Sequence, residues 1–523
     1  MAVPIARALR ATTAVAVVSA LALLPLAACS SSSDDDAAPR DAEGRASSSS
    51  STTEAPAPEV ERPDGPAATV TGEITGGRGI SLLAAAALPD LAENGYTETE
   101  YRATGTAVRY TSTGDLPTDG TFELEPGDSA DYATRIVVRR PAKAADFNGT
   151  VVVEWFNVSS GADVAPDYTY LADEIVRGGY AWVGVSAQHI GIEGGPVAVA
   201  APASELTGAG KGLKAFDPER YGDLAHPGDA FAYDLYTQIG RALRDPGDVD
   251  PLEGLDVERL LAVGESQSAF MLSTYANGVQ PLTHEFDGFL IHSRGGGVPG
   301  LGEPGAGLDV AGSIGRPPTT IRTDLDVPVM IVQTETDVLG IIGYYPARQD
   351  DTDRIRLWEI AGAAHADEFQ VGGVGDALGC SLPINAGQQH VVLKAALRHL
   401  DTWAQGGDAP PKADRLTVEG SGADLSFALD RVGNVLGGVR TPAVDAPVDV
   451  LSGLPAPGAS LICLLFGTTT PIPADQLAAR YPSRDDYVAE YEQATDAAID
   501  AGFALPEDRD AILAESQPDR LPG

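Results

Sequence analysis

Apolar runs alternate with amphipathic stretches through the middle of the chain. Several predicted strands contain short runs that are entirely apolar, such as Val151-Val152-Val153 and Leu260-Leu261-Ala262-Val263, which is typical of strands buried on both faces. The stretch 388–403 instead repeats its apolar residues at helical spacing. This alternation predicts an α/β fold, with a mostly parallel central sheet that helices cover on both faces. The predicted strands are Thr150–Phe156, Tyr180–Ser186, Val257–Val263, Phe286–His292, Val327–Thr334 and Ile355–Ile360, and the predicted helices are Asp167–Val176, Asp229–Leu243, Ser268–Asn277 and Gln388–Trp403.

The pattern changes at both ends of this region. From Ala67 to about Arg140, alternating β-branched and polar residues are separated by Gly and Pro turns, which indicates antiparallel strands. After Pro411 the chain has Pro-rich loops, one predicted helix at Arg484–Ala501, and the strongly apolar run Leu461–Phe466. We therefore expect a folded domain over residues 66–410, with a C-terminal extension over residues 411–523 that packs onto it.

The first residues have the pattern of an export signal. Two arginines precede the apolar stretch Ala11–Leu24, which is short for a membrane span and is followed by Leu26-Ala27-Ala28-Cys29. This tetrapeptide matches a bacterial lipobox, in which the cysteine becomes the lipidated first residue of the mature protein. We predict a lipoprotein signal peptide over residues 1–28 and an anchor at Cys29 that holds the protein on the membrane outside the cytoplasm. The alternative is an ordinary secretory signal with an incidental cysteine.

The segment that follows, residues 29–65, is rich in Ser, Asp and Pro and has almost no large apolar residue. Such a composition cannot bury a core, so we expect a disordered linker. The whole chain carries a formal net charge of -40. This charge argues against nucleic acid as a partner and against electrostatic docking on anionic lipid.

Two cysteines remain once Cys29 is assigned to the anchor. Outside the cytoplasm Cys380 and Cys463 can form a disulfide, and this is the interpretation that we favour. The alternative is two separate buried thiols.

A candidate catalytic motif follows the predicted strand Val257–Val263. The residues Gly264-Glu265-Ser266-Gln267-Ser268-Ala269 have the pattern of a nucleophile elbow, a tight strand-to-helix turn with a serine at its apex. The turn needs small residues two positions before and after the nucleophile. Gly264 and Ser268 meet this requirement around Ser266, whereas a nucleophile at Ser268 would place Phe270 in a small position. The motif has Ser where the consensus has a second Gly.

A serine nucleophile needs a general base and an acid that orients it, and in this kind of fold they follow in the order Ser, Asp or Glu, His. The strand Val327–Thr334 leads into a loop with Glu335 and Asp337, and the next strand leads into a small-residue loop that holds His365. We predict Ser266, Asp337 and His365 as the triad. Glu335 remains an alternative to Asp337, and His365 could instead be a surface histidine.

The oxyanion hole is predicted from the same template. One donor is the backbone N–H of Gln267, the residue after the nucleophile, and a second N–H is expected from the loop after the early strand, around Asn157 and Val158. Asn157 could also be a turn residue.

His226 precedes Pro-Gly-Asp and a predicted helix, so it could line the pocket, support the site or cap the helix with Asp229. Asp223, His226 and Asp229 make a poor metal site, because only His189 is nearby and no zinc motif is present. We expect neither metal nor cofactor.

With these motifs the chain resembles the α/β-hydrolase superfamily, and more narrowly a bacterial "alpha/beta hydrolase domain" family, from about Thr69 to Asp510. The motifs that carry the resemblance are Val153-Glu154-Trp155-Phe156-Asn157-Val158-Ser159, Arg220-Tyr221-Gly222-Asp223-Leu224-Ala225-His226-Pro227-Gly228-Asp229, Gly264 to Ala269, Gln333-Thr334-Glu335-Thr336-Asp337, Ala361-Gly362-Ala363-Ala364-His365-Ala366-Asp367 and Gly437-Gly438-Val439-Arg440-Thr441-Pro442. The resemblance implies a serine hydrolase fold in which Ser266 and His365 match the nucleophile and the base. It does not imply a particular substrate.

The function that we expect is a carboxylic-ester hydrolase that acts on a small-molecule ester through an acyl-enzyme on Ser266. Acyl transfer to an alcohol, or peptide hydrolysis, would use the same residues. A protein of another class, a lipid-anchored binding protein on a hydrolase-like fold, is a third hypothesis, because a fold alone does not prove an activity.

Overall fold

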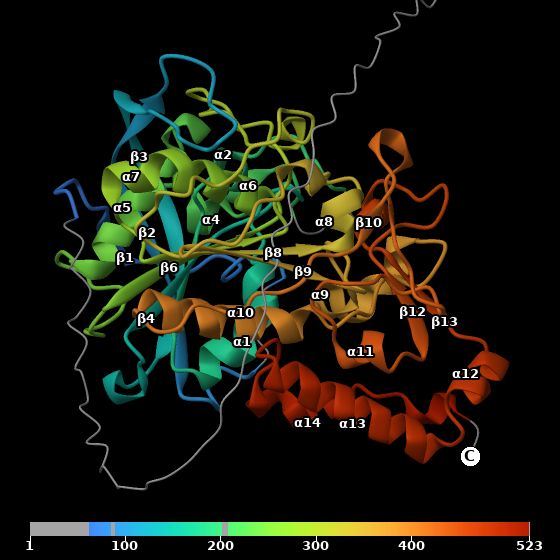
Figure 1. Cartoon of the computed structure of the whole chain (residues 1–523). Helices are drawn as coiled ribbons and strands as arrows, with labels where there is room; N and C mark the ends of the chain where they lie inside the picture. Colours follow the sequence, from blue (N-terminus) through green and yellow to red (C-terminus); the bar gives the residue numbers. More distant parts are fainter. Residues whose placement is uncertain (1–61, 85–88, 201–207, 522–523) are drawn as a thin grey trace, which may run out of the picture. The chain divides into compact units, whose positions relative to one another are not determined.

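The computed structural model describes residues 62–84, 89–200 and 208–521. The predicted signal peptide, Cys29 and all but the last residues of the predicted linker lie outside these ranges. The described residues contain a nine-stranded sheet of order β1-β2-β3-β5-β4-β6-β7-β8-β9 (Figure 1). Its strands are β1 (Thr69–Glu73), β2 (Tyr96–Thr111), β3 (Glu125–Pro141), β4 (Thr150–Trp155), β5 (Ala181–Val185), β6 (Arg259–Glu265), β7 (Gly288–His292), β8 (Val329–Thr334) and β9 (Ile355–Ile360).

The N-terminal strands are antiparallel, as the alternating pattern predicted. The long strands β2 and β3 pair along nearly their whole length, from Tyr96 opposite Pro141 to Thr111 opposite Glu125. β1 is antiparallel to β2, and β3 is antiparallel to β5. From β5 to β9 all neighbours are parallel. The predicted mostly parallel sheet with an antiparallel opening is therefore confirmed.

Helices cover both faces of the sheet. Along β4, Val151 and Val153 belong to the core that contains the buried residues of α5 (Ala232–Arg244) and α6 (Gln267–Thr274). Val152 belongs to the core on the opposite face, with α1 (Pro166–Arg177) and α10 (Gln389–Ala404). Neighbouring side chains of a strand point to opposite faces, so the apolar run Val151–Val153 of β4 reflects burial on both sides.

The predicted elements of the central region agree with the structure to within a few residues. The structure differs from the prediction at one strand and at one helix. Pro328 cannot donate a hydrogen bond to the sheet, and β8 begins only at Val329. The elbow helix α6 ends at Thr274 and continues as a π-helical turn over Tyr275–Val279. The short helices that the apolar pattern did not predict are α2 (His189–Glu193), α3 (Gly212–Phe216), α4 (Pro218–Tyr221), α7 (Gln280–Thr283), α8 (Glu335–Leu339) and α9 (Glu368–Val371).

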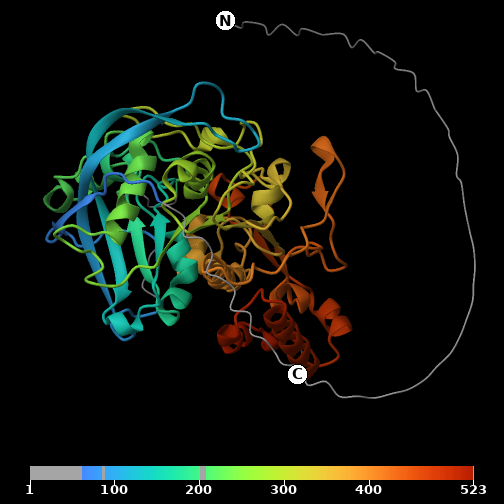
Figure 2. The same ribbon diagram turned by 60° about the vertical axis from the view of Figure 1, so that its left-hand side comes forward.

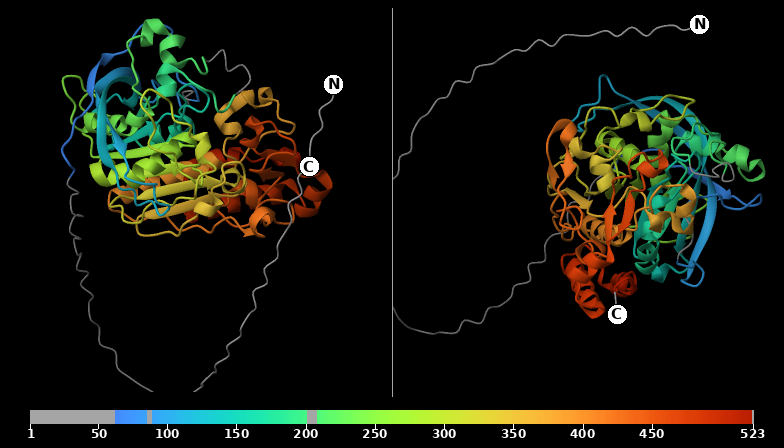
Figure 3. Two further views of the ribbon diagram at one scale, coloured as in Figure 1. Left: turned by 90° about the horizontal axis from the view of Figure 1, so that it is seen from above. Right: turned by 90° about the vertical axis from the view of Figure 1, so that its right-hand side faces the viewer.

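The C-terminal extension gathers on the β8–β9 side of the sheet, away from β1–β3 (Figures 2 and 3). The predicted helix at Arg484–Ala501 is α13 (Arg484–Asp500). The extension also contains structure that was not predicted: β10 (Val418–Glu419), β11 (Ser426–Phe427), β12 (Asp449–Ser452), β13 (Thr468–Pro471), α11 (Pro442–Asp445), α12 (Ala474–Arg480) and α14 (Arg509–Ala514). The described residues form one compact unit. No helix in the described part of the chain is long and apolar enough to cross a membrane.

A disulfide joins Cys380 of the predicted main domain to Cys463 of the extension. The predicted pairing is therefore confirmed, and the alternative of two separate thiols is wrong.

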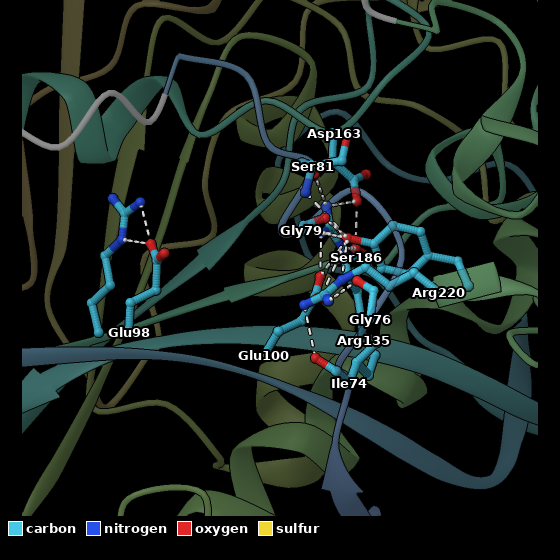
Figure 4. Close-up of polar contacts among 12 residues, drawn as sticks. Ile74, Gly76, Gly79, Ser81, Glu98, Glu100, Arg135, Asp163, Ser186 and Arg220 are labelled. Atoms are coloured by element: carbon cyan, nitrogen blue, oxygen red, sulfur yellow. Dashed lines mark hydrogen bonds and ion pairs between the residues drawn. The ribbon is translucent and has the colours of Figure 1, made fainter. Parts of the chain in front are cut away.

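A buried cluster of charges ties the antiparallel strands to the loop after β4. The guanidinium of Arg135 on β3 is fully buried and pairs with Glu100 on β2 and with Asp163, at 2.9 Å from the latter. It also donates hydrogen bonds to Ser186 Oγ and to the backbone oxygen of Ser81. Figure 4 shows these groups converging on Arg135. The loop that contains Asp163 and the segment around Ser81 are thereby held against the sheet, next to the site described below.

Candidate active site

Ser266 lies at the turn between β6 and α6, with a backbone φ of 58° and ψ of -120°. A non-glycine residue pays a conformational cost at positive φ, and such strain is common where a side chain must be presented. The strand and the helix approach each other closely here. A Cβ atom added to Gly264 would lie 2.9 Å from the Cβ of Ser268. The hydroxyl of Ser268 is buried, with no hydrogen-bond partner among the described residues. Ser268 is thus the small spacer, and Ser266 is the serine at the pocket.

Three of the predicted residues form a continuous hydrogen-bonded chain. His365 Nε2 lies 2.7 Å from Ser266 Oγ, and His365 Nδ1 lies 2.6 Å from Asp337 Oδ1. All three follow the carboxyl ends of parallel strands: Ser266 at the turn after β6, Asp337 in α8 after β8, and His365 in the loop after β9. The carboxyl ends of these strands meet at one edge of the sheet, which is why residues 99 and 28 positions away from His365 converge on it. His365 is therefore not a surface histidine.

Asp337 is held by several donors besides His365. Its Oδ2 accepts hydrogen bonds from Ser293 Oγ at 2.7 Å and from the backbone N–H of Thr334 at 2.7 Å. Burial would raise the pKa of this carboxyl, but His365 and the donors outweigh burial and lower it below its ordinary value. Asp337 is consequently ionised at neutral pH.

The same carboxylate acts on His365. Burial alone would lower the pKa of the imidazole, but Asp337, and to a smaller extent Glu265, raise it above its ordinary value. A base with a raised pKa is a better proton acceptor while it is neutral.

Glu335 has a different position from the one required of the triad acid. Its Oε1 accepts a hydrogen bond from the N–H of Gly362 at 2.6 Å, and its Oε2 accepts one from the N–H of Gly453 at 2.7 Å. Gly362 belongs to the loop that carries His365, and Gly453 belongs to the C-terminal extension. Burial raises the pKa of Glu335 to about 7. In this geometry Glu335 joins two loops, and Asp337 is the carboxylate that contacts the histidine.

The predicted oxyanion donors differ in whether their backbone N–H groups already donate a hydrogen bond. No described residue accepts a hydrogen bond from the backbone N–H of Gln267. By contrast, the N–H of Asn157 donates to the carbonyl of Val164 at 3.0 Å. The N–H of Val158 donates to the side-chain Oε1 of Gln267 at 2.8 Å. Asn157 therefore lies beside the site, but its backbone N–H is already used within its own loop.

The side chain of Asn157 holds this residue next to the nucleophile turn. Its amide donates to the backbone oxygen of Glu265 at 3.1 Å, which joins the loop after β4 to the residue before the nucleophile. Its Oδ1 accepts the N–H of Ser159, an Asx-type turn. The alternative interpretation of Asn157 as a turn residue thus describes one of its contacts.

A carboxyl that the sequence analysis did not single out lies at the site. Glu265 Oε1 is 3.5 Å from His365 Nε2, and Glu265 lines the same pocket as Ser266. Burial raises its pKa to about 7, although His365 and His292 oppose the effect of burial. The position of Glu265 between Gly264 and Ser266 was visible in the motif, but nothing in that spacing indicated that its side chain turns toward the histidine.

A second buried His–Asp pair, His292 and Asp167, lies next to the turn that carries Ser266. The backbone oxygen of His292 accepts the N–H of Ser266 at 2.9 Å. The side-chain Nδ1 of His292 lies 2.9 Å from Asp167 Oδ1, and both side chains are fully buried. Burial lowers the pKa of His292, but the hydrogen bond to Asp167 and its charge raise it to about 9. His292 is thus a cation at neutral pH, balanced by Asp167.

His226 lies outside this site. Its Nε2 is 2.9 Å from the backbone oxygen of Ala187, its Nδ1 is 3.2 Å from the N–H of Gly228, and burial lowers its pKa. Asp229 accepts the N–H of His189 and that of Leu308. These contacts organise backbone loops. Among the described residues no group of His, Cys, Asp and Glu is arranged to hold a metal ion.

The site opens into a pocket of about 450 Å³. Ser266, His365 and Glu265 lie in its lining, together with Asn157. Most of the other lining residues are apolar, and they come from the N-terminal segment, the loop after β4, the loop after β9 and the C-terminal extension. The pocket therefore joins a polar, strained serine to a largely apolar wall.

The chain matches a family model described as "Alpha/beta hydrolase domain" over residues 64–514. The protein belongs to this family, so the resemblance noted from the motifs is confirmed and the molecule is an α/β hydrolase.

Several solved structures are also similar to the chain. Esterases from Rhizomucor miehei are 12% identical, with 58% of this chain and 85% of theirs covered and a TM-score of 0.28. A dienelactone hydrolase from Anabaena variabilis is 12% identical over 53% of this chain and 92% of its own, with a TM-score of 0.26. A glucuronoyl esterase from Solibacter usitatus is 9% identical, with 57% of this chain and 83% of its own covered and a TM-score of 0.26. None of the curated proteins compared with the chain gives a significant match.

Proposed function

We propose that the protein is a serine hydrolase of carboxylic esters that acts through an acyl-enzyme on Ser266. The observation that carries this proposal is the unbroken chain from Ser266 Oγ through His365 to Asp337, with contacts of 2.7 and 2.6 Å. A serine hydroxyl is too weak an acid to attack an ester unaided, and this arrangement supplies the base and the carboxylate that orients it.

In the proposed reaction, neutral His365 accepts the proton of Ser266 Oγ through Nε2 while that oxygen attacks the ester carbonyl. Asp337 holds the Nδ1–H of the imidazole and stabilises the imidazolium that forms. The tetrahedral intermediate collapses as His365 gives its proton to the leaving alcohol, which leaves an acyl-Ser266 ester. Water then attacks this ester with His365 again as base, and the carboxylic acid and free Ser266 are released.

For the oxyanion we propose the free N–H of Gln267 as one donor. Asn157 contributes through its side chain, which fixes the loop after β4 against Glu265. Within that loop we propose the N–H of Val158 as the second donor: it now donates to the side chain of Gln267, and a rotation of that side chain would free it.

The test is labelling of the full chain with a fluorophosphonate probe, together with hydrolysis of p-nitrophenyl acetate. We expect labelling and hydrolysis in the wild type, no labelling in Ser266→Ala, and a loss of turnover of about 10⁴–10⁶-fold. Hydrolysis at the wild-type rate by Ser266→Ala would contradict the proposal. An unlabelled, folded wild type would favour a binding protein. Ester products with an added acceptor alcohol would indicate acyl transfer, and cleavage of peptides but not esters would indicate a peptidase.

We further propose that Cys29 is lipidated and anchors the enzyme to the outer face of the cell membrane. The lipobox-like sequence before Cys29 and the polar segment after it support this proposal. Mass spectrometry of the protein purified from a bacterial membrane should find a mature chain that begins at Cys29 and carries acyl groups. A Cys29→Ser variant should lose the acyl groups and leave the membrane fraction, and a soluble, unmodified wild type would contradict the anchor.

A further inference from the structure

Part of the pocket wall comes from the C-terminal extension. Ile462, Leu465 and Phe466 line the pocket that contains Ser266 and His365. They pack in one apolar cluster with Ala366, the residue after His365, and with Leu378 from the turn η7 (Gly372–Leu378). The extension is thus a component of the site.

Backbone contacts fix this wall to the catalytic loop. The N–H of Ala366 donates to the carbonyl of Leu465 at 3.1 Å, and the N–H of Asn385 donates to the carbonyl of Phe466 at 2.8 Å. The disulfide between Cys380 and Cys463 crosses the same cluster, next to Ile462 on one side and two residues after Leu378 on the other. The wall therefore has a fixed position relative to His365, as a specificity pocket requires.

The charge of the lining restricts the substrate. Among the described residues that line the pocket there is no Lys or Arg, and the titratable groups are Glu265 and His365. The chain as a whole carries a net charge of -40. An ester with a carboxylate in its chain would leave that charge unpaired against apolar side chains and near Glu265, which is costly.

We infer that Ile462, Leu465 and Phe466 of the extension form the specificity wall of this pocket, and that the wall selects uncharged esters with an apolar chain. This inference rests on the proposed esterase activity of Ser266. The apolar chain belongs either to the acyl part or to the alcohol part of the ester. Two series of substrates, one that varies each part, distinguish these two cases.

The experiment measures kcat/KM of the full chain on p-nitrophenyl acetate, hexanoate and heptanoate, and on acetate esters of ethanol, butanol and hexanol. In at least one series kcat/KM should rise with chain length. The mono-p-nitrophenyl ester of adipic acid, which ends in a carboxylate, should react at least about 100-fold more slowly than the heptanoate.

Ile462→Ala should lower the ratio of kcat/KM for the longer ester to that for the acetate or ethyl ester by about 10-fold, because it removes apolar contact from the wall. Leu465→Arg should reverse the charge preference and raise the relative rate on the adipate ester. Leu461→Ala is the matched control. Leu461 neighbours Ile462 but is 56% exposed and does not line the pocket, so its replacement should leave the ratio unchanged.

Fluorophosphonate labelling of Ser266 is measured in every variant. If the wild type is labelled and hydrolyses short esters, but shows no dependence on chain length or charge, the inference is wrong while the proposed function stands. The same holds if Ile462→Ala and Leu461→Ala behave alike. If the wild type is neither labelled nor active on any ester, the proposed function fails, and the inference fails with it.

Discussion

Glu335 and Gly453 are joined by a hydrogen bond of 2.7 Å, from the backbone N–H of the glycine to Oε2 of the carboxylate. The other oxygen of Glu335 accepts the N–H of Gly362, three residues before His365. One carboxylate thus links the extension to the histidine loop. The hydroxyl of the next residue, Thr336, extends this link, since it donates to Gly453 O and accepts the N–H of His365. Glu335 thus fixes the loop of His365 against the extension, and we predict that it is a positioning residue that acts through His365.

Replacement of Glu335 by Gln should reduce kcat more than it changes KM. A Gln side chain has one acceptor oxygen, so one of the two backbone N–H groups loses its partner in a buried place, at a cost of about 1–3 kcal/mol. We expect a comparable loss of stability in urea unfolding and a fall in kcat of about 10–100-fold. Asp350→Asn, at an exposed carboxylate on the loop before β9, should change neither kcat nor stability. If the fall appeared in KM alone, the positioning role would be wrong.

The disulfide gives a second prediction. Cys380 and Cys463 are separated by 83 residues, and cross-linking so long a loop restricts the unfolded chain. The double variant Cys380→Ser, Cys463→Ser should lose about 2–4 kcal/mol of stability and melt at a lower Tm. Reduction of the wild type with dithiothreitol should reproduce this loss, whereas the double variant should not respond to the reductant. Equal Tm values for oxidised wild type and variant would contradict the prediction.

Much of the fold follows from local pattern. The strands β4, β6 and β8 each contain an apolar run of three or four residues, and the parallel order of the sheet follows from their alternation with helices. The same logic led to Ser266 and His365, because each follows a strand whose carboxyl end lies at the same edge of the sheet.

Contacts between distant segments were not predictable in this way. Whether Asp337 or Glu335 faces His365 depends on how α8 begins. The Thr334 side chain and that of Asp337 form a capping box, which turns Asp337 back toward the site and leaves Glu335 facing the extension. The sequence also did not show that the backbone N–H of Asn157 is unavailable to an oxyanion. This N–H donates to Val164 of the same loop, a contact that no spacing rule gives. The short strands of the extension were missed because they are two to four residues long.

The buried cluster around Arg135 should be important for stability. Arg135→Leu removes the cation that pairs with Asp163, and a carboxylate left buried without its partner typically costs about 3–5 kcal/mol. Urea unfolding of the variant should show a loss of this size. Arg109 is the matched control, since its partner Asp128 is 80% exposed, and Arg109→Leu should cost less than about 1 kcal/mol. A loss below 1 kcal/mol for Arg135→Leu would show that Asp163 finds another partner.

The last prediction concerns Glu265 and the pH dependence of stability and activity. Its pKa is raised by burial from 4.5 to about 7, so the native state binds a proton that the unfolded chain releases between these values. Its contribution to stability is therefore intact below about pH 4.5 and is lost as the pH rises toward and past 7. Glu265→Gln removes this dependence. The variant should gain about 3 kcal/mol relative to wild type between pH 4.5 and 8, as measured by urea unfolding at each pH.

The same substitution should move the acid limb of the activity profile. The Glu265 carboxylate lies 3.5 Å from His365 Nε2 and raises the pKa of that imidazole, so Gln at this position should let His365 lose its proton at lower pH. We expect the acid limb of kcat/KM on p-nitrophenyl acetate to shift to lower pH in Glu265→Gln. Glu368 is an exposed carboxylate three residues after His365, and Glu368→Gln should leave both the limb and the stability profile where they are. An acid limb that Glu265→Gln leaves unmoved would mean that Glu265 stays protonated throughout and does not act on the base.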